Sequence, residues 1–277
     1  MASSPAPGMR RLGTATVRSF GSGAQVVLLH GGAGSWMHWS RNIDALARHC
    51  HVHAVDLPGF GDADDVPAET SPDAYLDLVH AALAPLAARG GLGVIGFSFG
   101  GAVGARLARM LGADCTGLAL VGSGGFGPAP GRVLDLRRVP PRHDPSFHDA
   151  VRHNLLVSML ADPVTADAAT VDQQITNLAR TRFDSRRVSL RPTLMNDLAE
   201  LRAPLTAIWG SADRLASPSV AARIEQVRRV RPDTRVSIVP DAGHWTQYER
   251  ADVVNPLLID FVTTLGASGR RDAEAPA

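Results

Sequence analysis

Short apolar strands alternate with helical segments in this chain, and this alternation restricts its fold more than any other feature. Residues 25–30 (QVVLLH) form a continuous apolar run, which is typical of a strand buried on both faces of a parallel sheet. Further strands are expected at 14–20, 51–57, 91–97 and 117–123, with helices between them at 39–48, 71–88 and 100–111. Strand–helix–strand units at this spacing predict an α/β protein with a mostly parallel sheet flanked by helices.

The alternation stops after residue 123 and resumes near residue 203. The intervening residues contain glycine- and proline-rich stretches and helical patterns, but no clear strand. The later part predicts strands at 204–210 and 235–240 and helices at 218–231 and around 253–265. We therefore expect an α/β core formed by residues 1–123 and 203–277, interrupted by a helical cap inserted over residues 124–202.

The composition is that of an ordinary globular protein and argues against several partners. The chain has 277 residues, a formal net charge of +1 and 45% hydrophobic residues. A nucleic-acid-binding domain would show a basic face, and no apolar run reaches the ~18–20 residues that span a bilayer. The first residues lack the apolar region of a signal peptide, and Cys50 and Cys115 form no disulfide framework. We expect a cytoplasmic protein that acts on a small molecule, without nucleic acid or membrane as partner; a homodimer remains open.

A serine, an aspartate and a histidine each follow a predicted strand. Ser98 ends one strand within GFSFGG (96–101), while Asp213 and His244 follow the two late strands. In doubly wound sheets the functional groups lie at the carboxyl ends of strands, and nucleophile, acid and histidine in this chain order are typical of the α/β-hydrolase fold. The sequence predicts that His244 takes the proton of Ser98 and that Asp213 orients the imidazole. Asp241 is a rival acid, but its position favours a role in the turn before His244.

Glycines frame Ser98 on both sides. Gly96 and Gly100 leave room for a sharp strand-to-helix turn, which holds the serine in a strained conformation with its hydroxyl clear of the sheet. The turn also places Ser98 at a helix N-terminus, which favours developing negative charge. We expect the backbone N–H groups of Phe99 and Gly32 to form an oxyanion hole.

Other motifs are interpreted as structural. GLGVIG (91–96) fits the dinucleotide pattern GxGxxG, but it leads into a strand instead of following one. His49, His51 and His53 would share one face of a strand, yet no carboxylate or cysteine lies beside them at metal-ligand spacing. DLPGFG (56–61) is interpreted as a turn. We expect neither a metal nor a cofactor.

The whole chain resembles an α/β-hydrolase with a cap after its sixth strand, and two stretches indicate a narrower group. VGSGGFG (121–127) and GHWTQYERADVVNPLLIDFV (243–262) are most similar to the meta-cleavage product hydrolases. That family hydrolyses a carbon–carbon bond in vinylogous 1,5-diketone acids with a Ser-Asp-His triad and no cofactor. The resemblance implies that Ser98, Asp213 and His244 carry catalysis and that Trp245 lines the substrate pocket. It also implies that the family's first strand is abbreviated or absent, because the N-terminus is short.

The sequence departs from that family at three positions. Phe97 and His38 stand where the family has asparagines, and His38 is expected to line the pocket with Phe97 and Trp245. Thr176 stands where a cap arginine grips the substrate carboxylate, with Arg180 and Arg182 close by. An apolar Phe97 suits an ester or a less charged ketone.

These features favour a cofactor-independent serine hydrolase acting on a small, fairly apolar carbonyl substrate, with a carboxylic ester slightly preferred. The first alternative is a carbon–carbon bond hydrolase of the meta-cleavage product type. The others are a triad-based lyase or perhydrolase and a non-catalytic ligand-binding module.

Overall fold

The strands assemble into a single mixed sheet. The computed structural model describes residues 8–129 and 134–273, and over these residues it contains an eight-stranded sheet in the order β1-β2-β4-β3-β5-β6-β7-β8. The strands are β1 (Gly8–Leu12), β2 (Ala15–Phe20), β3 (Gln25–Leu29), β4 (His51–Asp56), β5 (Leu92–Phe97), β6 (Cys115–Val121), β7 (Leu205–Gly210) and β8 (Arg235–Val239). β3 to β8 run parallel, whereas β2 pairs antiparallel with both of its neighbours, β1 and β4. The predicted α/β-hydrolase architecture is confirmed.

The expectation of an abbreviated or absent first strand is wrong. β1 pairs with β2 from Gly8↔Ser19 to Leu12↔Ala15, and Gly13 at φ +53° occupies the two-residue turn between them. Tight hairpins favour glycine where φ is positive. The strand was missed because Gly8 to Arg11 are exposed on the sheet edge, so the sequence shows no alternation of apolar and polar residues.

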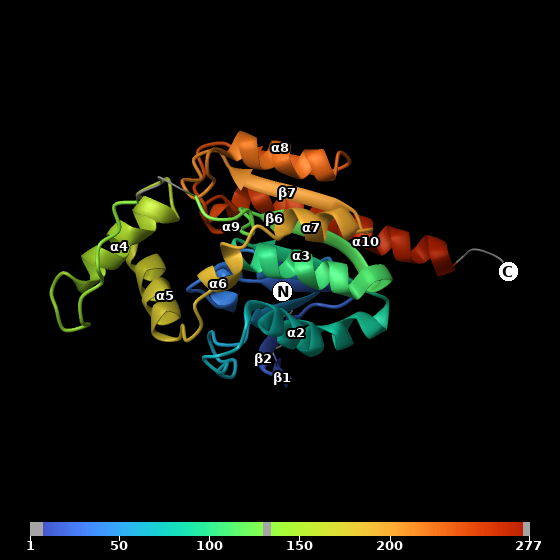
Figure 1. The fold of residues 1–277 in the computed structure, drawn as a ribbon, viewed down its shortest axis with the longest axis horizontal. Helices are drawn as coiled ribbons and strands as arrows, with labels where there is room; N and C mark the ends of the chain where they lie inside the picture. Colours follow the sequence, from blue (N-terminus) through green and yellow to red (C-terminus); the bar gives the residue numbers. More distant parts are fainter. Residues whose placement is uncertain (1–7, 130–133, 274–277) are drawn as a thin grey trace.

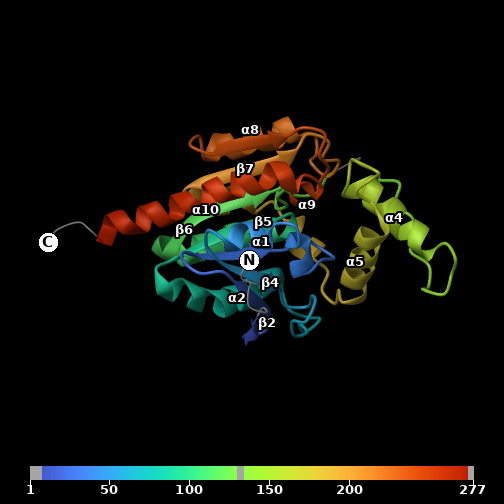
Figure 2. The same cartoon turned by 180° about the vertical axis from the view of Figure 1, so that it is seen from behind.

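Helices cover both faces of the sheet and bury two apolar cores (Figures 1 and 2). The first face carries α2 (Pro72–Leu83), α3 (Phe99–Leu111) and α8 (Val220–Val230), and the second carries α1 (Ile43–Ala47) and α10 (Ala251–Ala273). Ser71 caps α2 by accepting a hydrogen bond from the Ala74 N–H, with Pro72 at the first helical position. Short helical turns occur at η1 (Trp36–Trp39), η2 (Ala84–Arg89), η3 (Gly112–Asp114) and α9 (Thr246–Glu249).

The described residues between β6 and β7 form four helices: α4 (Phe147–Ser158), α5 (Ala168–Ala179), α6 (Arg186–Ser189) and α7 (Leu194–Glu200). Figure 1 shows α4 and α5 projecting beyond the carboxyl ends of the parallel strands, whereas α7 lies along α3. The described residues of this segment contain no strand. The helices of the described chain also include none with the length and hydropathy to cross a bilayer.

Candidate active site

Ser98 occupies a strained turn between β5 and α3. Its backbone has φ +53° and ψ −115°, a region that non-glycine residues rarely adopt. The turn is fixed on both sides, because the Ser98 N–H donates to the Val121 carbonyl at 2.9 Å and the Ser98 carbonyl accepts from the Gly124 N–H at 2.9 Å. The side chain consequently projects from the end of β5 into a cavity.

The glycines around Ser98 are required by close approach of backbone. A Cβ atom at Gly96 would lie 2.2 Å from the Gly100 carbonyl oxygen, and one at Gly100 would lie 2.4 Å from the Leu29 carbonyl oxygen. Both of these oxygens belong to the backbone and not to a flexible side chain, so either clash could be relieved only by a shift of the backbone. The glycine frame thus lets α3 start directly against β3.

Ser98, His244 and Asp213 form a continuous chain of hydrogen bonds. The Nε2 of His244 lies 2.8 Å from the Oγ of Ser98, and its Nδ1 lies 2.9 Å from Oδ2 of Asp213. The other carboxylate oxygen accepts from the N–H groups of Leu215 at 2.8 Å and Ala216 at 3.2 Å. Because both oxygens of Asp213 are engaged, its buried carboxylate has a fixed orientation and directs the Nδ1–H tautomer of His244.

Asp241 has a different position. Its backbone N–H donates to the Oγ of Ser211 at 2.9 Å, and its φ of +55° turns the chain after β8. No hydrogen bond joins its exposed carboxylate to His244 within residues 8–129 and 134–273. Asp241 therefore shapes the turn, and Asp213 is the carboxylate that contacts the histidine.

A cavity of about 750 Å³ opens above Ser98 and His244. Gly32, Phe97 and Phe99 line it from the core, and the opposite wall comes from residues between β6 and β7, including Leu136, Met159, Phe183, Ser185 and Leu190. The core and the inserted helices therefore enclose the hydroxyl of Ser98 together. The size is that of a pocket for a small organic molecule.

The charged side chains in the cavity wall are already paired. Arg182 donates to the Asp65 carboxylate and to the Ala63 carbonyl at 2.6 Å, and Arg186 donates to Asp184 at 2.8 Å. The guanidinium of each arginine is thus held by the protein itself. Among the described lining residues, no arginine is left free to grip a substrate carboxylate.

The other two cap positions considered from the sequence lie outside the cavity wall. Thr176 is half-buried on α5 and donates to the Asp172 carbonyl at 2.9 Å. Arg180 forms an ion pair with Asp62 at 2.7 Å. The structure therefore puts neither residue in the wall of the cavity that contains Ser98.

His38 and Trp245 do not line the cavity, which corrects their expected placement; of the three predicted pocket residues, Phe97 alone does. Both side chains are buried behind the loop that carries Gly32. The Trp245 Nε1–H donates to the His38 carbonyl at 3.0 Å, and the Gly31 N–H donates to Nδ1 of His38 at 3.1 Å. The short turn η1 directs the imidazole inward, a local geometry that the sequence pattern did not reveal.

Burial sets the protonation of His38. Loss of solvation lowers its pKa well below the ordinary value, and the nearby imidazoles of His30 and His244 lower it further. The ring is neutral at pH 7, so its Nδ1 is available to accept from Gly31. His38 thus holds the backbone beside Gly32.

Two residues near the site had no signal in the sequence. A Cβ atom built on Gly32 would lie 2.3 Å from the Oγ of Ser185, so this hydroxyl sits directly over the Gly32 loop. Glu249 accepts from the Gly243 N–H at 2.5 Å with one oxygen and from the N–H groups of Ala161 and Asp162 with the other. It joins the loop that carries His244 to the segment after α4. The positions of Ser185 and Glu249 depend on contacts between distant parts of the chain, so the local sequence gives no indication of them.

Comparison with known proteins agrees with this fold. Residues 26–257 match the sequence model of the Alpha/beta hydrolase family, and the chain belongs to that family. It is an enzyme of the α/β-hydrolase class, with relatives among the carbon–carbon bond hydrolases that the sequence resembled.

Three similar proteins carry names that describe different activities. A 2-hydroxy-6-oxononadienedioate/2-hydroxy-6-oxononatrienedioate hydrolase from Pseudomonas sp is 28% identical, covering 90% of this chain and 92% of the relative. The dihydrolipoyllysine-residue acetyltransferase component of the acetoin cleaving system of Pseudomonas putida is 29% identical, covering 94% of this chain and 70% of the relative. The solved esterase RhEst1 from Rhodococcus sp. ECU1013 superimposes with a TM-score of 0.75 at 22% identity, covering 93% of this chain and 99% of that chain.

Proposed function

We propose that this enzyme is a cofactor-independent serine hydrolase that cleaves small, fairly apolar carboxylic esters. The observation that carries the proposal is the hydrogen-bonded chain from Ser98 through His244 to Asp213, placed on the floor of a cavity whose charged side chains are paired. An unactivated serine is a weak nucleophile, and a histidine within hydrogen-bond distance supplies the base that it needs.

The acylation step follows from this geometry. His244 Nε2 removes the proton of the Ser98 hydroxyl as Oγ attacks the ester carbonyl, and the resulting imidazolium is stabilised by the Asp213 carboxylate. The tetrahedral intermediate then collapses, the bond to the alcohol oxygen breaks, and His244 returns the proton to the leaving alkoxide. A water molecule, activated by the same histidine, hydrolyses the acyl-enzyme and releases the acid.

The oxyanion hole in this proposal consists of two backbone N–H groups. The N–H of Phe99 lies in the first turn of α3, where it has no acceptor within the helix and where the helix dipole favours negative charge. The N–H of Gly32 makes no hydrogen bond to another described residue, and Gly32 lines the cavity beside Ser98. Each such donor stabilises the transition state by roughly 3–4 kcal/mol in enzymes of this kind.

The paired charges and Phe97 support an uncharged substrate. Phe97 lies against the triad, with its ring 5.1 Å from that of His244, where the related family has an asparagine. Arg182 and Arg186 are held by carboxylates of the protein, so a substrate carboxylate would have to displace an existing partner. We infer that residues 124–202 act as a cap that selects substrates by shape and apolar contact.

The second candidate is hydrolysis of a carbon–carbon bond. It is favoured by the relative from Pseudomonas sp, whose name describes cleavage of a dienedioate, and by the stretch around His244 that resembles such enzymes. The same triad and oxyanion hole would serve this reaction, but the substrate's carboxylate would require a free cation in the cavity.

A substrate comparison tests the proposal. The intact enzyme is assayed with p-nitrophenyl butyrate and with a ring-cleavage dienone acid, with Ser98→Ala as the control. Turnover of the ester that Ser98→Ala abolishes supports the proposal. Turnover of the dienone acid alone would replace it with the second candidate, and tight ligand binding without turnover would indicate a binding module. A perhydrolase would form a peroxy acid when hydrogen peroxide is added to the ester assay, and a hydroxynitrile-type lyase would release cyanide and an aldehyde from a cyanohydrin.

A further inference from the structure

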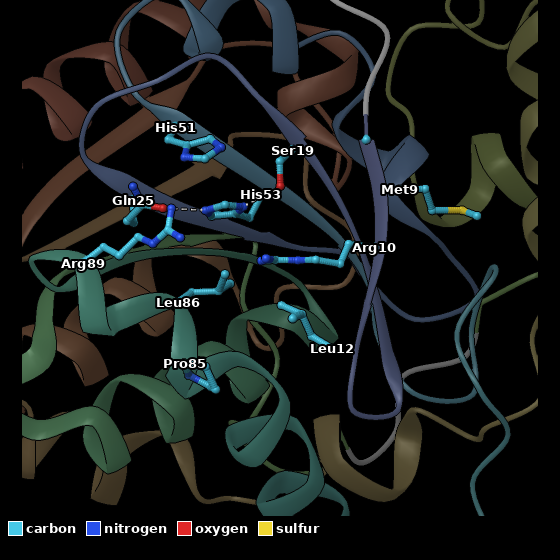
Figure 3. Close-up of a pocket in the computed structure, with 11 residues that line it drawn as sticks. Met9, Arg10, Leu12, Ser19, Gln25, His51, His53, Pro85, Leu86 and Arg89 are labelled. Atoms are coloured by element: carbon cyan, nitrogen blue, oxygen red, sulfur yellow. Dashed lines mark hydrogen bonds between the residues drawn. The ribbon is translucent and has the colours of Figure 1, made fainter.

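A second cavity lies at the opposite end of the sheet from Ser98. Its volume is about 550 Å³, and Gln25 and His51, at the starts of β3 and β4, contribute to its wall. Ser98 follows the carboxyl end of β5, so the two cavities are at opposite ends of the parallel strands. Figure 3 shows this cavity between the β1–β2 hairpin, β4 and η2. We propose that it binds the phosphate or carboxylate group of a small organic anion, a role independent of the esterase activity proposed above.

Two unpaired arginines converge on this cavity. Arg10 extends from β1 and Arg89 from the end of η2, and both reach toward His53 from opposite sides (Figure 3). Neither guanidinium has a carboxylate partner or a hydrogen bond among the described residues. The N-terminal segment cannot supply one, because the first acidic residue of the chain is Asp44. In contrast, Arg18 on the adjacent strand is paired with Asp56 and Asp62.

Polar groups between the arginines are fixed in orientation. His53 is 2% exposed, and its Nε2 lies 2.8 Å from Oε1 of Gln25 while its Nδ1 lies 2.8 Å from Oγ of Ser19. Because the amide oxygen of Gln25 only accepts, Nε2 carries the proton and Nδ1 accepts from the hydroxyl of Ser19. The imidazole of His51 lies beside that of His53, with ring centroids 4.4 Å apart.

The electrostatic environment of these histidines is positive. Burial is the main cause that lowers the pKa of His51 and the pKa of His53, and it brings the pKa of His53 to about 4 together with the nearby charges. The positive charges of Arg10 and Arg89 lower both pKa values further. His49 lies outside β4, so the expected row of three histidines on one strand face is reduced to two. No group of described residues forms a metal-ligating cluster here. Two guanidinium groups on opposite sides of neutral imidazoles thus give this cavity a positive charge.

The donors and the apolar wall together define the class of ligand. Guanidinium groups present paired N–H donors that match the oxygens of phosphate and carboxylate. Leu12 and Leu86 supply apolar surface in the same cavity, which suits an organic portion attached to the anionic group. A cavity of this size accepts a small molecule, whereas a free inorganic ion would leave most of it unfilled.

Calorimetric titration of the intact protein at fixed ionic strength tests the proposal, with phenyl phosphate, benzoate and inorganic phosphate as probes. We expect saturable one-site binding of phenyl phosphate or benzoate that weakens at least tenfold in Arg10→Gln and in Arg89→Gln. Arg202→Gln is the matched control, since this exposed arginine precedes β7 and has no partner among the described residues. The stronger of the two organic probes identifies the preferred anionic group.

Two results would overturn the proposal. One is the absence of saturable binding for all three probes. The other is binding that persists unchanged in the Arg10→Gln, Arg89→Gln double variant, which would assign it to another site, such as the cavity above Ser98. We expect both variants to keep the wild-type fold, because both arginines are exposed and neither contributes to a core. Circular dichroism and thermal melting of each variant check this.

Discussion

The backbone N–H of Gly31 donates a hydrogen bond to Nδ1 of His38 across 3.1 Å, and this contact fixes the loop that carries the proposed oxyanion donor Gly32. His38 is fully buried and is not among the residues of the cavity wall, so we expect it to act by positioning that loop. Loop placement of this kind matters because small displacements of a donor cost much of its contribution to the transition state.

Replacing His38 by alanine is expected to lower kcat by about 10- to 100-fold while changing KM little, since the oxyanion donor is displaced but the cavity is not. His38→Gln, whose side chain retains an acceptor, should recover part of the loss. Steady-state kinetics with p-nitrophenyl butyrate measure kcat and KM for both variants. An alanine variant that raises KM and leaves kcat unchanged would instead place His38 in the substrate pocket.

Removing the charge of Glu249 is expected to loosen the loop that carries His244. In the wild type, three backbone N–H groups donate hydrogen bonds to the Glu249 carboxylate. Glu249→Gln replaces one carboxylate oxygen by an NH₂ group, which cannot accept them, so we expect the free energy of unfolding to fall by about 1–3 kcal/mol. Chemical denaturation measures the change. Glu225→Gln on the exposed side of α8 is the control, and equal effects in the two variants would contradict this role for Glu249.

A methyl group at Gly100 is expected to disrupt the turn that presents Ser98. Gly100→Ala would place its Cβ atom 2.4 Å from the Leu29 carbonyl oxygen, so β3 and α3 must separate. We expect a loss of more than about 2 kcal/mol in stability together with loss of activity. Gly8→Ala, where nothing lies within 4 Å of the added atom, should change the free energy of unfolding little. Thermal melting compares the two.

The free energy of unfolding should fall as the pH drops below about 6.5, because His53 is held neutral. Burial lowers its pKa to about 4 in the folded state, so the unfolded state binds the proton more readily. The stability linked to this group is complete above the unfolded pKa and is lost as the pH falls toward 4, amounting to about 3 kcal/mol.

The His53→Gln variant isolates this contribution. We expect a shallower loss of stability between pH 7 and pH 4 than in the wild type, measured by urea denaturation at each pH. His49→Gln should retain the wild-type slope, since this neighbouring histidine is exposed. Identical slopes in the His53→Gln variant and the wild type would show that another group controls the acid transition.

The sequence predicted most of the sheet because its central strands are buried on both faces. Gln25–Leu29 and Leu92–Phe97 are continuous apolar runs, and the residues that follow them include Gly32 and Ser98. β1 escaped prediction for the opposite reason, since its side chains are exposed and follow no pattern. Local sequence therefore specified the central strands, which the core encloses, and missed β1 at one edge of the sheet.

The sequence predicted only those site residues whose place follows from the order of the strands along the chain. Ser98, Asp213 and His244 each follow a strand, so the topology of the sheet brings them together without further detail. The inward turn of His38 and the approach of Ser185 to Gly32 arise from packing between segments far apart in sequence, which no local pattern records.

The central claim is that Ser98 is the nucleophile, and intact mass spectrometry after treatment with a fluorophosphonate tests it most directly. The probe should add one equivalent of mass to the wild-type protein, peptide mapping should place it on Ser98, and Ser98→Ala should remain unlabelled. His244→Gln should react far more slowly, because the base that removes the serine proton is absent. A wild-type protein that stays unmodified, or one labelled on a residue other than Ser98, would contradict the claim.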